Sequence, residues 1–446
     1  METYATKRDR LARDMRQAQG AIRLEKKTTN LFRARREVPG RKLNVRDFNS
    51  VILVNPNEQR VDVEGMTSYE KLVDECLKFH VMPAVVPELK SITIGGAVSG
   101  TGLESSSFRY GFVHETVSEM DILLPDGRVI TCTSDNEYKD LFFCIPNSYG
   151  TLGYILKLKA KTIAVKPYVH IVHTHASDTR QFFSATKEQC KKGDANFVEG
   201  VVLGEKSLVL SVARFSDTAP YTSDYTYRHI YYKSLLGRAE DYLTVRDYIW
   251  RWDTDWFWRS DIVMAQNPLV RLLLGKKHLN SIFYTKVMHW NRKWRIFNKV
   301  RAFRKKKSET VIQDVEIPID DAAKFLEFLH REIQMLPIII GPVIGSPVGI
   351  ARFPLFPLEP HILYVNIGFW NAIPAREGEE IGYLNKLIEA KVTELNGRKM
   401  LYSDSYFTQE EFWKLYGGKD TYDRLKQKYD PERKLKNLYE KCVLRA

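Results

Sequence analysis

The chain has 446 residues, of which 44% are hydrophobic and 28% are charged, and its formal net charge is +13. These values exclude a disordered or fibrous protein, and the length suggests two or three domains. The charge is uneven: residues 1–44 carry +8 and residues 289–307 carry +9, which leaves −4 for the other 383 residues. A protein that wraps nucleic acid over its whole surface is not expected to look like this, whereas one that touches an anionic surface at two places could.

The spacing of the cysteines and the shortness of the apolar runs indicate the cellular compartment in which the protein is expected. None of the five cysteines has CxxC spacing, so neither a disulfide framework nor a zinc site is predicted, and a reducing compartment is favoured. The first 20 residues lack the apolar core of a signal peptide. No apolar run approaches the roughly 20 residues that span a bilayer. We therefore expect a cytoplasmic protein that is soluble or peripherally membrane-associated and has no metal site.

The first third of the chain predicts a basic arm followed by a compact α/β unit. Residues 1–27 read as a basic, solvated helix followed by a linker. Apolar residues at helical spacing predict a helix over 69–79, and Pro125-Asp-Gly127 predicts the turn of a hairpin over 120–132. Further strands are predicted at 51–54, 61–64 and 153–165.

Near Pro167 the character of the sequence changes, so we place a domain boundary there. Strand-like runs fill 168–215, and an aromatic-rich, basic, helix-leaning region fills 216–310. Beyond it the pattern predicts strands at 311–317 and 362–367, and helices at 322–333 and 381–395. The predicted units are a basic N-terminal arm at 1–27, a first domain at 28–166 and a second at 167–446.

A glycine-rich stretch at 85–111 is the most informative segment. Five glycines fall within 17 residues: Gly95, Gly96, Gly100, Gly102 and Gly111. Glycines let a backbone approach a ligand closely and expose N–H groups that bind anions. A plain glycine-rich turn between strands is the alternative. Neither the Rossmann nor the P-loop spacing is present, so those two nucleotide sites are not supported.

This stretch resembles the flavin-binding motif of the vanillyl-alcohol oxidase and p-cresol methylhydroxylase (PCMH) superfamily, and residues 147–153 resemble its second FAD motif. Residues 100–107, 197–200, 401–406 and 411–413 are similar to delta(24)-sterol reductases and to bacterial methylene-fatty-acyl reductases. The resemblance implies an α+β protein. A PCMH-type FAD-binding domain of two small α/β subdomains at 28–166 would precede an α+β substrate or cap domain.

The resemblance also implies which residues hold FAD, and that the cofactor is not covalently bound. The family often tethers FAD through a histidine near position 103, where this chain has Leu103. The membrane-spanning N-terminus of animal sterol reductases is missing, which argues against integral membrane attachment. The implied FAD contacts are Pro87, Thr93, Gly95, Gly96, Gly100, Gly102, Ser105, Gly111, His114, Val117, Gly150, Gly153 and Ile155.

The implied reaction is the reduction of an isolated carbon–carbon double bond of a membrane lipid. Hydride comes from flavin N5, a proton comes from an acid, and NAD(P)H is the expected electron donor. Candidate acids are Tyr402, Asp404, Tyr406 and Glu104. The aromatic run at 248–258 is either a wall that stabilises a cation or a hydrophobic core segment. A flavin-dependent oxidase or dehydrogenase of an alcohol or sugar is the alternative function.

The second basic segment, 289–307, combines aromatic residues at helical spacing with nine basic residues. Such a segment is typical of a helix that lies in a membrane interface. We therefore expect it to dock on an anionic membrane surface from which the lipid substrate is drawn. A solvated surface helix is the alternative, and nucleic-acid binding is not expected.

Overall fold

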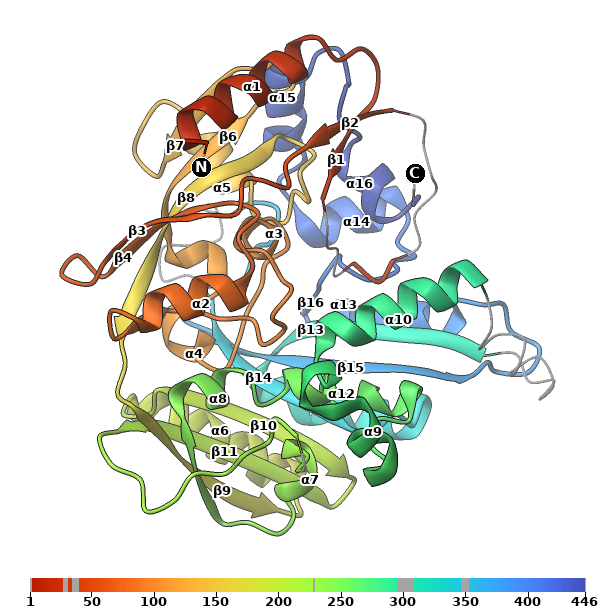
Figure 1. Ribbon diagram of the computed structural model, residues 1–446. Coiled ribbons are helices and arrows are strands. Elements are labelled where there is room, and N and C mark those ends of the chain that lie inside the picture. The colour runs from red at the N-terminus through yellow and green to blue at the C-terminus, as the bar shows by residue number, and fades with distance from the viewer. Residues whose placement is uncertain are drawn as a thin grey trace.

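The structure is a computed structural model that describes residues 2–26, 31–33, 40–227, 229–294, 308–345 and 353–445, without the side chains of 262 and 288–294. Two sheets organise the molecule, one above the other in Figure 1. The upper sheet has the strand order β3-β4-β8-β6-β7, with β5 paired to β8. Its strands are β3 (Val51–Asn55), β4 (Arg60–Glu64), β5 (Val81–Pro83), β6 (Val117–Leu123), β7 (Val129–Thr133) and β8 (Tyr154–Ala164).

The local elements predicted for the upper unit are confirmed to within a few residues. The β6–β7 hairpin turns at Gly127, which has φ +82° and donates its N–H to the carbonyl of Leu124. Ser68 caps α2, and one face of this helix is fully buried against the sheet. The helices of the unit are α2 (Tyr69–Leu77), α3 (Ile94–Ser99), α4 (Ser107–Tyr110), η1 (Val113–Thr116) and α5 (Lys139–Cys144).

The lower sheet has eight strands in the order β12-β9-β11-β10-β14-β15-β13-β16, and every neighbouring pair is antiparallel. The chain enters it between Ala164 and Tyr168, where the sequence pattern changes at Pro167. Its strands are β9 (Tyr168–Ala176), β10 (Phe197–Gly204), β11 (Ser207–Ser216), β12 (Glu240–Thr244), β13 (Ser308–Pro318), β14 (Ile338–Ile344), β15 (Leu363–Pro374) and β16 (Arg398–Lys399).

The two faces of the lower sheet have different partners. Helices α6 (Thr179–Lys192), α12 (Ala322–Phe328) and α13 (Tyr383–Glu394) pack their apolar residues on one face. The opposite face contributes Phe197 and Val209 to a core shared with the upper unit. Mixed helices and largely antiparallel strands make the protein α+β, as predicted.

Both ends of the chain complete the upper unit. Helices α14 (Gln409–Tyr416), α15 (Lys419–Tyr429) and α16 (Leu438–Cys442) return to it, and their buried Tyr416, Tyr422 and Leu438 share one core with Leu72 and Ile122. Figure 1 shows these helices in blue beside the red N-terminal helix. The predicted boundary near Pro167 thus separates the two sheets but not the C-terminal residues from the upper unit.

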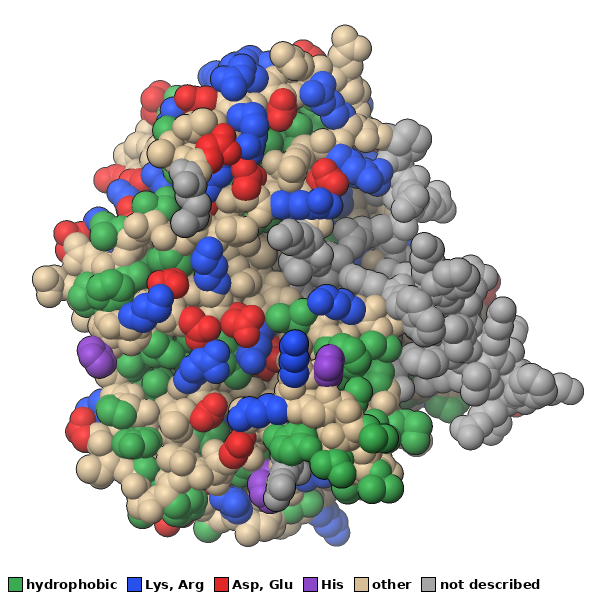
Figure 2. Space-filling view, viewed as in Figure 1, with side chains coloured by type: hydrophobic (Ala, Val, Ile, Leu, Met, Phe, Trp, Pro, Cys, Tyr) green, Lys and Arg blue, Asp and Glu red, His purple; other side chains and the backbone are tan. Residues whose placement is uncertain are grey.

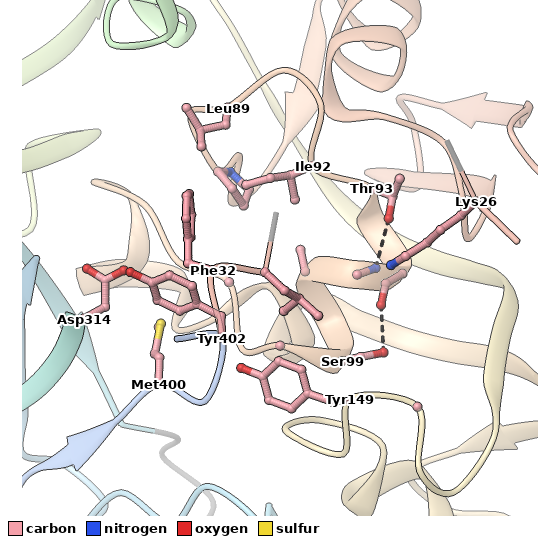
Figure 3. Close-up of a pocket in the computed structure, with 18 of the residues that line it drawn as sticks. Lys26, Phe32, Leu89, Ile92, Thr93, Ser99, Tyr149, Asp314, Met400 and Tyr402 are labelled. Carbon is pink, nitrogen blue, oxygen red and sulfur yellow. Dashed lines mark hydrogen bonds between the residues drawn. The ribbon is translucent and has the colours of Figure 1, made fainter. Parts of the chain in front are cut away.

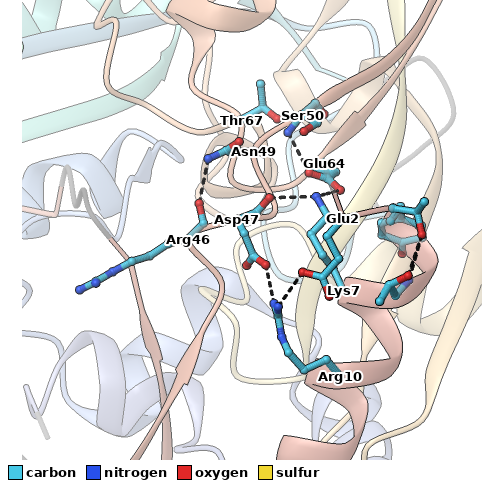
Figure 4. Close-up of polar contacts among 12 residues, drawn as sticks. Glu2, Lys7, Arg10, Arg46, Asp47, Asn49, Ser50, Glu64 and Thr67 are labelled. Atoms are coloured by element: carbon cyan, nitrogen blue, oxygen red, sulfur yellow. Dashed lines mark hydrogen bonds and ion pairs between the residues drawn. The ribbon is translucent and has the colours of Figure 1, made fainter.

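The N-terminal helix α1 (Tyr4–Arg16) is present but is not solvated along its whole length as the sequence pattern suggested. Leu11 and Met15, four residues apart on one face, are fully buried. Lys7 forms a buried ion pair with Glu64 and donates to the carbonyl of Asp47 at 2.9 Å (Figure 4). The helix therefore packs on the body despite its basic composition, because Leu11 and Met15 are buried and the one buried cation, Lys7, is paired with Glu64.

Short helices and turns fill the aromatic, basic region on both sides of β12, as far as β13. They are α7 (Tyr231–Ser234), which precedes β12, then α8 (Val245–Ile249), η2 (Asp253–Asp255), η3 (Arg259–Val263), α9 (Pro268–His278) and α10 (Ser281–Trp294). The backbone of α10 covers the start of the predicted interfacial segment 289–307, but the side chains that would decide that prediction lie outside the described residues. Within the described ranges, no helix is both long and apolar enough to cross a bilayer.

Candidate functional site

A cavity of about 1080 Å³ lies between the two sheets and is lined by residues from both. This volume is at the upper end of the range of roughly 300–1,000 Å³ that is usual for ligand pockets. Its wall includes the glycine-rich stretch, the β8 loop, the inner face of the lower sheet and the C-terminal segment. Figure 3 shows part of this lining.

One wall of the cavity has almost no side chains. Gly95, Gly96, Gly100 and Gly102 line it from α3 and the loop that follows, and Gly150 and Gly153 from the turn before β8. Thr93 caps α3 by accepting from the N–H of Gly96 at 3.3 Å. A Cβ at Gly95 would lie 2.7 Å from the carbonyl oxygen of Gly65, so this part of the wall has no room for a side chain.

Basic side chains line the cavity as well. The set consists of Arg23, Lys26, Lys42, Arg46, Arg259, Lys436 and Lys441. Lys441 donates to the carbonyl of Tyr149 at 2.7 Å, and burial, with the nearby charges of Arg33 and Lys26, lowers its pKa to about 7. Cations beside a bare backbone wall suit a phosphate or diphosphate group.

The remaining wall is apolar and aromatic. Phe32, Leu89, Trp256, Phe257 and Trp370 all line it. All four tryptophans of the 248–258 run are buried. Trp250 and Trp252 belong to the core, as one interpretation of that run predicted, whereas Trp256 and Phe257 line the cavity.

A carboxyl and a phenol meet at this apolar wall. Strand alternation turns Ile312 and Asp314 of β13 into the cavity and Val311 and Val315 into the core beneath the helices. Figure 3 shows Asp314 beside Tyr402. Burial raises the pKa of Asp314 from 3.8 to about 7, although hydrogen bonds from Tyr402 and Trp370 act against the rise. This carboxyl can therefore hold a proton near neutral pH.

A second acidic group surrounds the buried guanidinium of Arg251. Its nitrogen Nη2 lies 2.6 Å from Glu199, 2.8 Å from Glu88 and 3.7 Å from Glu104. All three carboxyl groups line the cavity. Burial raises the pKa of Glu88 well above its usual range, with Glu104 and Glu199 adding to the rise. One cation cannot balance three carboxylates, so this cluster also retains a proton.

Ten of the thirteen residues predicted to hold FAD line the cavity: Pro87, Thr93, Gly95, Gly96, Gly100, Gly102, Ser105, Gly150, Gly153 and Ile155. Gly111, His114 and Val117 lie outside its lining. His114 packs between Phe112 and Phe353, at ring distances of 5.4 and 4.5 Å, and burial lowers its pKa to about 3. These three residues lie behind the glycine loop, where the N–H of Val113 donates to the carbonyl of Gly102.

The structure divides the four predicted acids into two pairs. Tyr402 and Glu104 line the cavity, whereas Asp404 and Tyr406 do not. A turn at 401–403 redirects the chain, and the buried Nζ of Lys399 donates to the carbonyl of Asp404 at 2.7 Å. The carboxylate of Asp404 lies 3.4 Å from Nε of Arg445, and the ring of Tyr406 packs against the same guanidinium.

Sequence reasoning missed Asp314 and Arg251. The signal for Asp314 was available, because Asp314 and Glu316 alternate with apolar residues in a strand that was predicted from its pattern. Arg251 lies between Trp250 and Trp252 in the aromatic run, which was interpreted from its aromatic residues only. Neither residue could be assigned to a site without knowing which face of which strand borders the cavity.

The comparisons with known proteins agree with this geometry. Residues 9–133 match a family model described as an FAD binding domain, which begins within α1. The chain is 25% identical over 418 residues to the human delta(24)-sterol reductase, covering 89% of this chain and 76% of that protein. It is 24% identical over 432 residues to the Arabidopsis thaliana delta(24)-sterol reductase, covering 86% and 73%. Cytokinin dehydrogenase 1 of Arabidopsis thaliana is 24% identical over 389 residues, covering 83% and 64%.

Proposed function

Because the chain is an FAD-binding oxidoreductase related to delta(24)-sterol reductases, we propose that it reduces an isolated carbon–carbon double bond of a lipid. The observation that carries the proposal is the composition of the cavity. A glycine wall and cations suited to a dinucleotide share it with an apolar wall that contains a carboxyl whose pKa burial raises to about 7. A reductase needs an acid at this position, and a carboxyl with this pKa can hold and deliver a proton near neutral pH.

The residues present fit FAD. The residues from Pro87 to Ser105 would contact the diphosphate and the ribityl chain, and Gly150, Gly153 and Ile155 would hold the adenosine half. Neither histidine nor cysteine occurs among the described residues that line the cavity, which supports non-covalent binding. When bound, the cofactor supplies a hydride for the double bond and is reduced in turn by NAD(P)H.

Asp314 is the proton source in this proposal. An isolated alkene is a poor hydride acceptor, so transfer of the Asp314 proton to one carbon leads and leaves positive charge on the other. Phe257 and Trp370, which line the same cavity, would stabilise that charge. Tyr402, which accepts from Nε1 of Trp370 at 2.7 Å, orients the carboxyl. Glu104 accepts from the hydroxyl of Ser105 at 2.5 Å and belongs to the carboxyl cluster around Arg251, so it is not the proton source in this proposal.

The test is anaerobic reduction of the purified protein followed by addition of a lipid. We expect NADPH or NADH to bleach the flavin absorbance, and a delta(24)-sterol or a phospholipid with a methylene-branched acyl chain to restore it. The product gains two hydrogens, of which one is deuterium when the reaction runs in heavy water. Oxygen consumption with an alcohol or sugar, without reduction of either lipid, would establish the alternative oxidase function.

Binding of FAD should depend on pH through Lys441. Its pKa of about 7 should rise beside a diphosphate, so FAD affinity falls by up to about tenfold per pH unit above pH 7. Lys441→Met should bind FAD more weakly at pH 6 and lose this dependence, as measured by fluorescence titration of the apoprotein. Lys436→Met, which removes another cation that lines the cavity, is the control and should keep it. An equal pH dependence in wild type and Lys441→Met would refute the assignment.

A further inference from the structure

Helix α9 carries an unusual apolar surface. Leu269, Leu272 and Leu273 are 71%, 64% and 86% exposed, and Met264 just before the helix is 64% exposed. Figure 2 shows hydrophobic side chains gathered at the lower right, over the position that α9 has in Figure 1. The spacing of the leucines at i, i+3 and i+4 places them on one face of the helix. We call Met264, Leu269, Leu272 and Leu273 the α9 face.

The α9 face is held in place by the opposite side of the helix. Arg271 is buried, ion-paired with Asp255, and donates to the carbonyl of Tyr227 at 2.8 Å. Asn267 caps the helix by accepting from the N–H of Leu269 at 2.9 Å. The exposure of the leucines therefore does not result from a detached helix, because the helix is anchored through a buried cation.

The helix adjoins the aromatic wall of the cavity. Leu274 of α9 packs in one cluster with Leu279, Tyr284 and Trp256. Trp256 and its neighbour Phe32, at a ring distance of 6.1 Å, both line the cavity. Helix α9 thus packs, through Leu274, on the cluster whose Trp256 lines the apolar wall at which the double bond would react.

The surrounding sequence is strongly basic. Between Ile262 and Ser308 the chain has thirteen Lys and Arg residues and no Asp or Glu. Arg271 pairs with Asp255, and Lys276 lies 3.8 Å from Asp224. The other eleven cations, Lys277 at the end of α9 among them, still give this stretch of 47 residues a large excess of positive charge. Exposed leucines with cations beside them suit an interface that is both apolar and anionic.

We propose that the α9 face inserts into an anionic lipid bilayer and holds the aromatic wall of the cavity at the membrane surface. The inference rests on the proposed function, since a lipid substrate has to leave a bilayer to reach Asp314. A second copy of the chain is a poorer occupant. Four side chains cannot supply the roughly 800 Å² per partner that a standard protein interface buries, and the two copies would bring like charges together.

The test compares binding of the FAD-loaded protein to phosphatidylcholine vesicles with and without phosphatidylglycerol. We expect binding only to the anionic vesicles. The triple variant Leu269→Gln, Leu272→Gln, Leu273→Gln should bind about tenfold or more weakly, with its FAD content and melting temperature unchanged. The control Ile52→Thr, Leu53→Thr removes two side chains of β3 that are 46% and 47% exposed, and should bind as wild type.

The rates of lipid reduction in detergent and in vesicles distinguish a failure of this inference from a failure of the proposed function. The triple variant should reduce detergent-dispersed lipid at the wild-type rate and vesicle-embedded lipid at a rate about tenfold lower. Undiminished vesicle binding by the triple variant would overturn the proposal. So would a wild-type dimer without vesicles that the triple variant converts to a monomer, because the face would then be a contact between copies. Loss of activity in detergent for wild type would instead contradict the proposed function.

Discussion

Asp314→Asn should lower the rate of lipid reduction by about 10²–10⁴-fold, which is the usual contribution of a positioned acid. The variant keeps the size of the side chain and its hydrogen bonding to Tyr402 and Trp370 but has no proton to transfer. Flavin reduction by NAD(P)H should continue at the wild-type rate, because that step needs no proton from Asp314. Stopped-flow measurement of the two half-reactions separates these effects.

The pH dependence of lipid reduction and of stability provides a second test of Asp314 as the proton donor. Asp314 must be protonated to act, so the wild-type rate of lipid reduction should fall as the pH rises through about 7. The raised pKa also makes the folded state bind the proton more tightly than the unfolded state. The contribution of Asp314 to the free energy of unfolding is therefore present below pH 3.8 and is lost as the pH rises to about 7. Asp314→Asn should remove the contribution of this group to the pH dependence of both the rate of lipid reduction and the free energy of unfolding.

Two further variants complete that experiment. Asp320→Asn removes a carboxyl that is 77% exposed and paired with Lys187, and should leave the rate and its pH dependence unchanged. Tyr402→Phe should lower the rate less than Asp314→Asn does, because the phenol orients the carboxyl. A full loss in Tyr402→Phe together with an active Asp314→Asn would make Tyr402 the donor and would refute the role given to Asp314.

Arg251→Met should destabilise the fold by about 3–5 kcal/mol, the usual effect of removing one partner from a buried ion pair. Without the guanidinium, Glu88, Glu104 and Glu199 have to be protonated or remain as uncompensated charges. The pKa of Glu88, which Arg251 lowers in the native protein, then rises further, so the loss of stability should be larger at pH 8 than at pH 5. Urea unfolding at both pH values measures the difference.

The matched control is Arg246→Met, because Arg246 pairs with Asp74 on the surface, where the side chains are 48% and 40% exposed. Solvent screens such a pair, and we expect a change of less than about 1 kcal/mol at either pH. A small, pH-independent effect of Arg251→Met would mean that the three carboxyl groups are neutral in the native protein and do not need the cation.

Some features could be predicted because they depend on neighbours in the chain. The 120–132 hairpin follows from Pro125-Asp-Gly127, and the strand at 311–317 follows from alternation of its side chains. The glycine-rich loop could be recognised because its conformation allows few other residues. Segment 1–27 was misjudged as fully solvated, because its burial depends on Glu64 and on an apolar surface that distant residues build.

From the sequence, the resemblance of its glycine-rich motifs to a flavoprotein family identified FAD as the cofactor and six of the seven predicted glycines as neighbours of the cavity. A motif of this kind can be recognised because close approach of a backbone leaves little choice of residue. The tertiary structure alone decided which acids line the cavity. Asp314, Trp370 and Tyr402 come from β13, β15 and a C-terminal turn, and they meet only when the sheet forms. The same holds for the pKa of Asp314, which depends on burial, and burial is a property of the assembled fold and not of a motif.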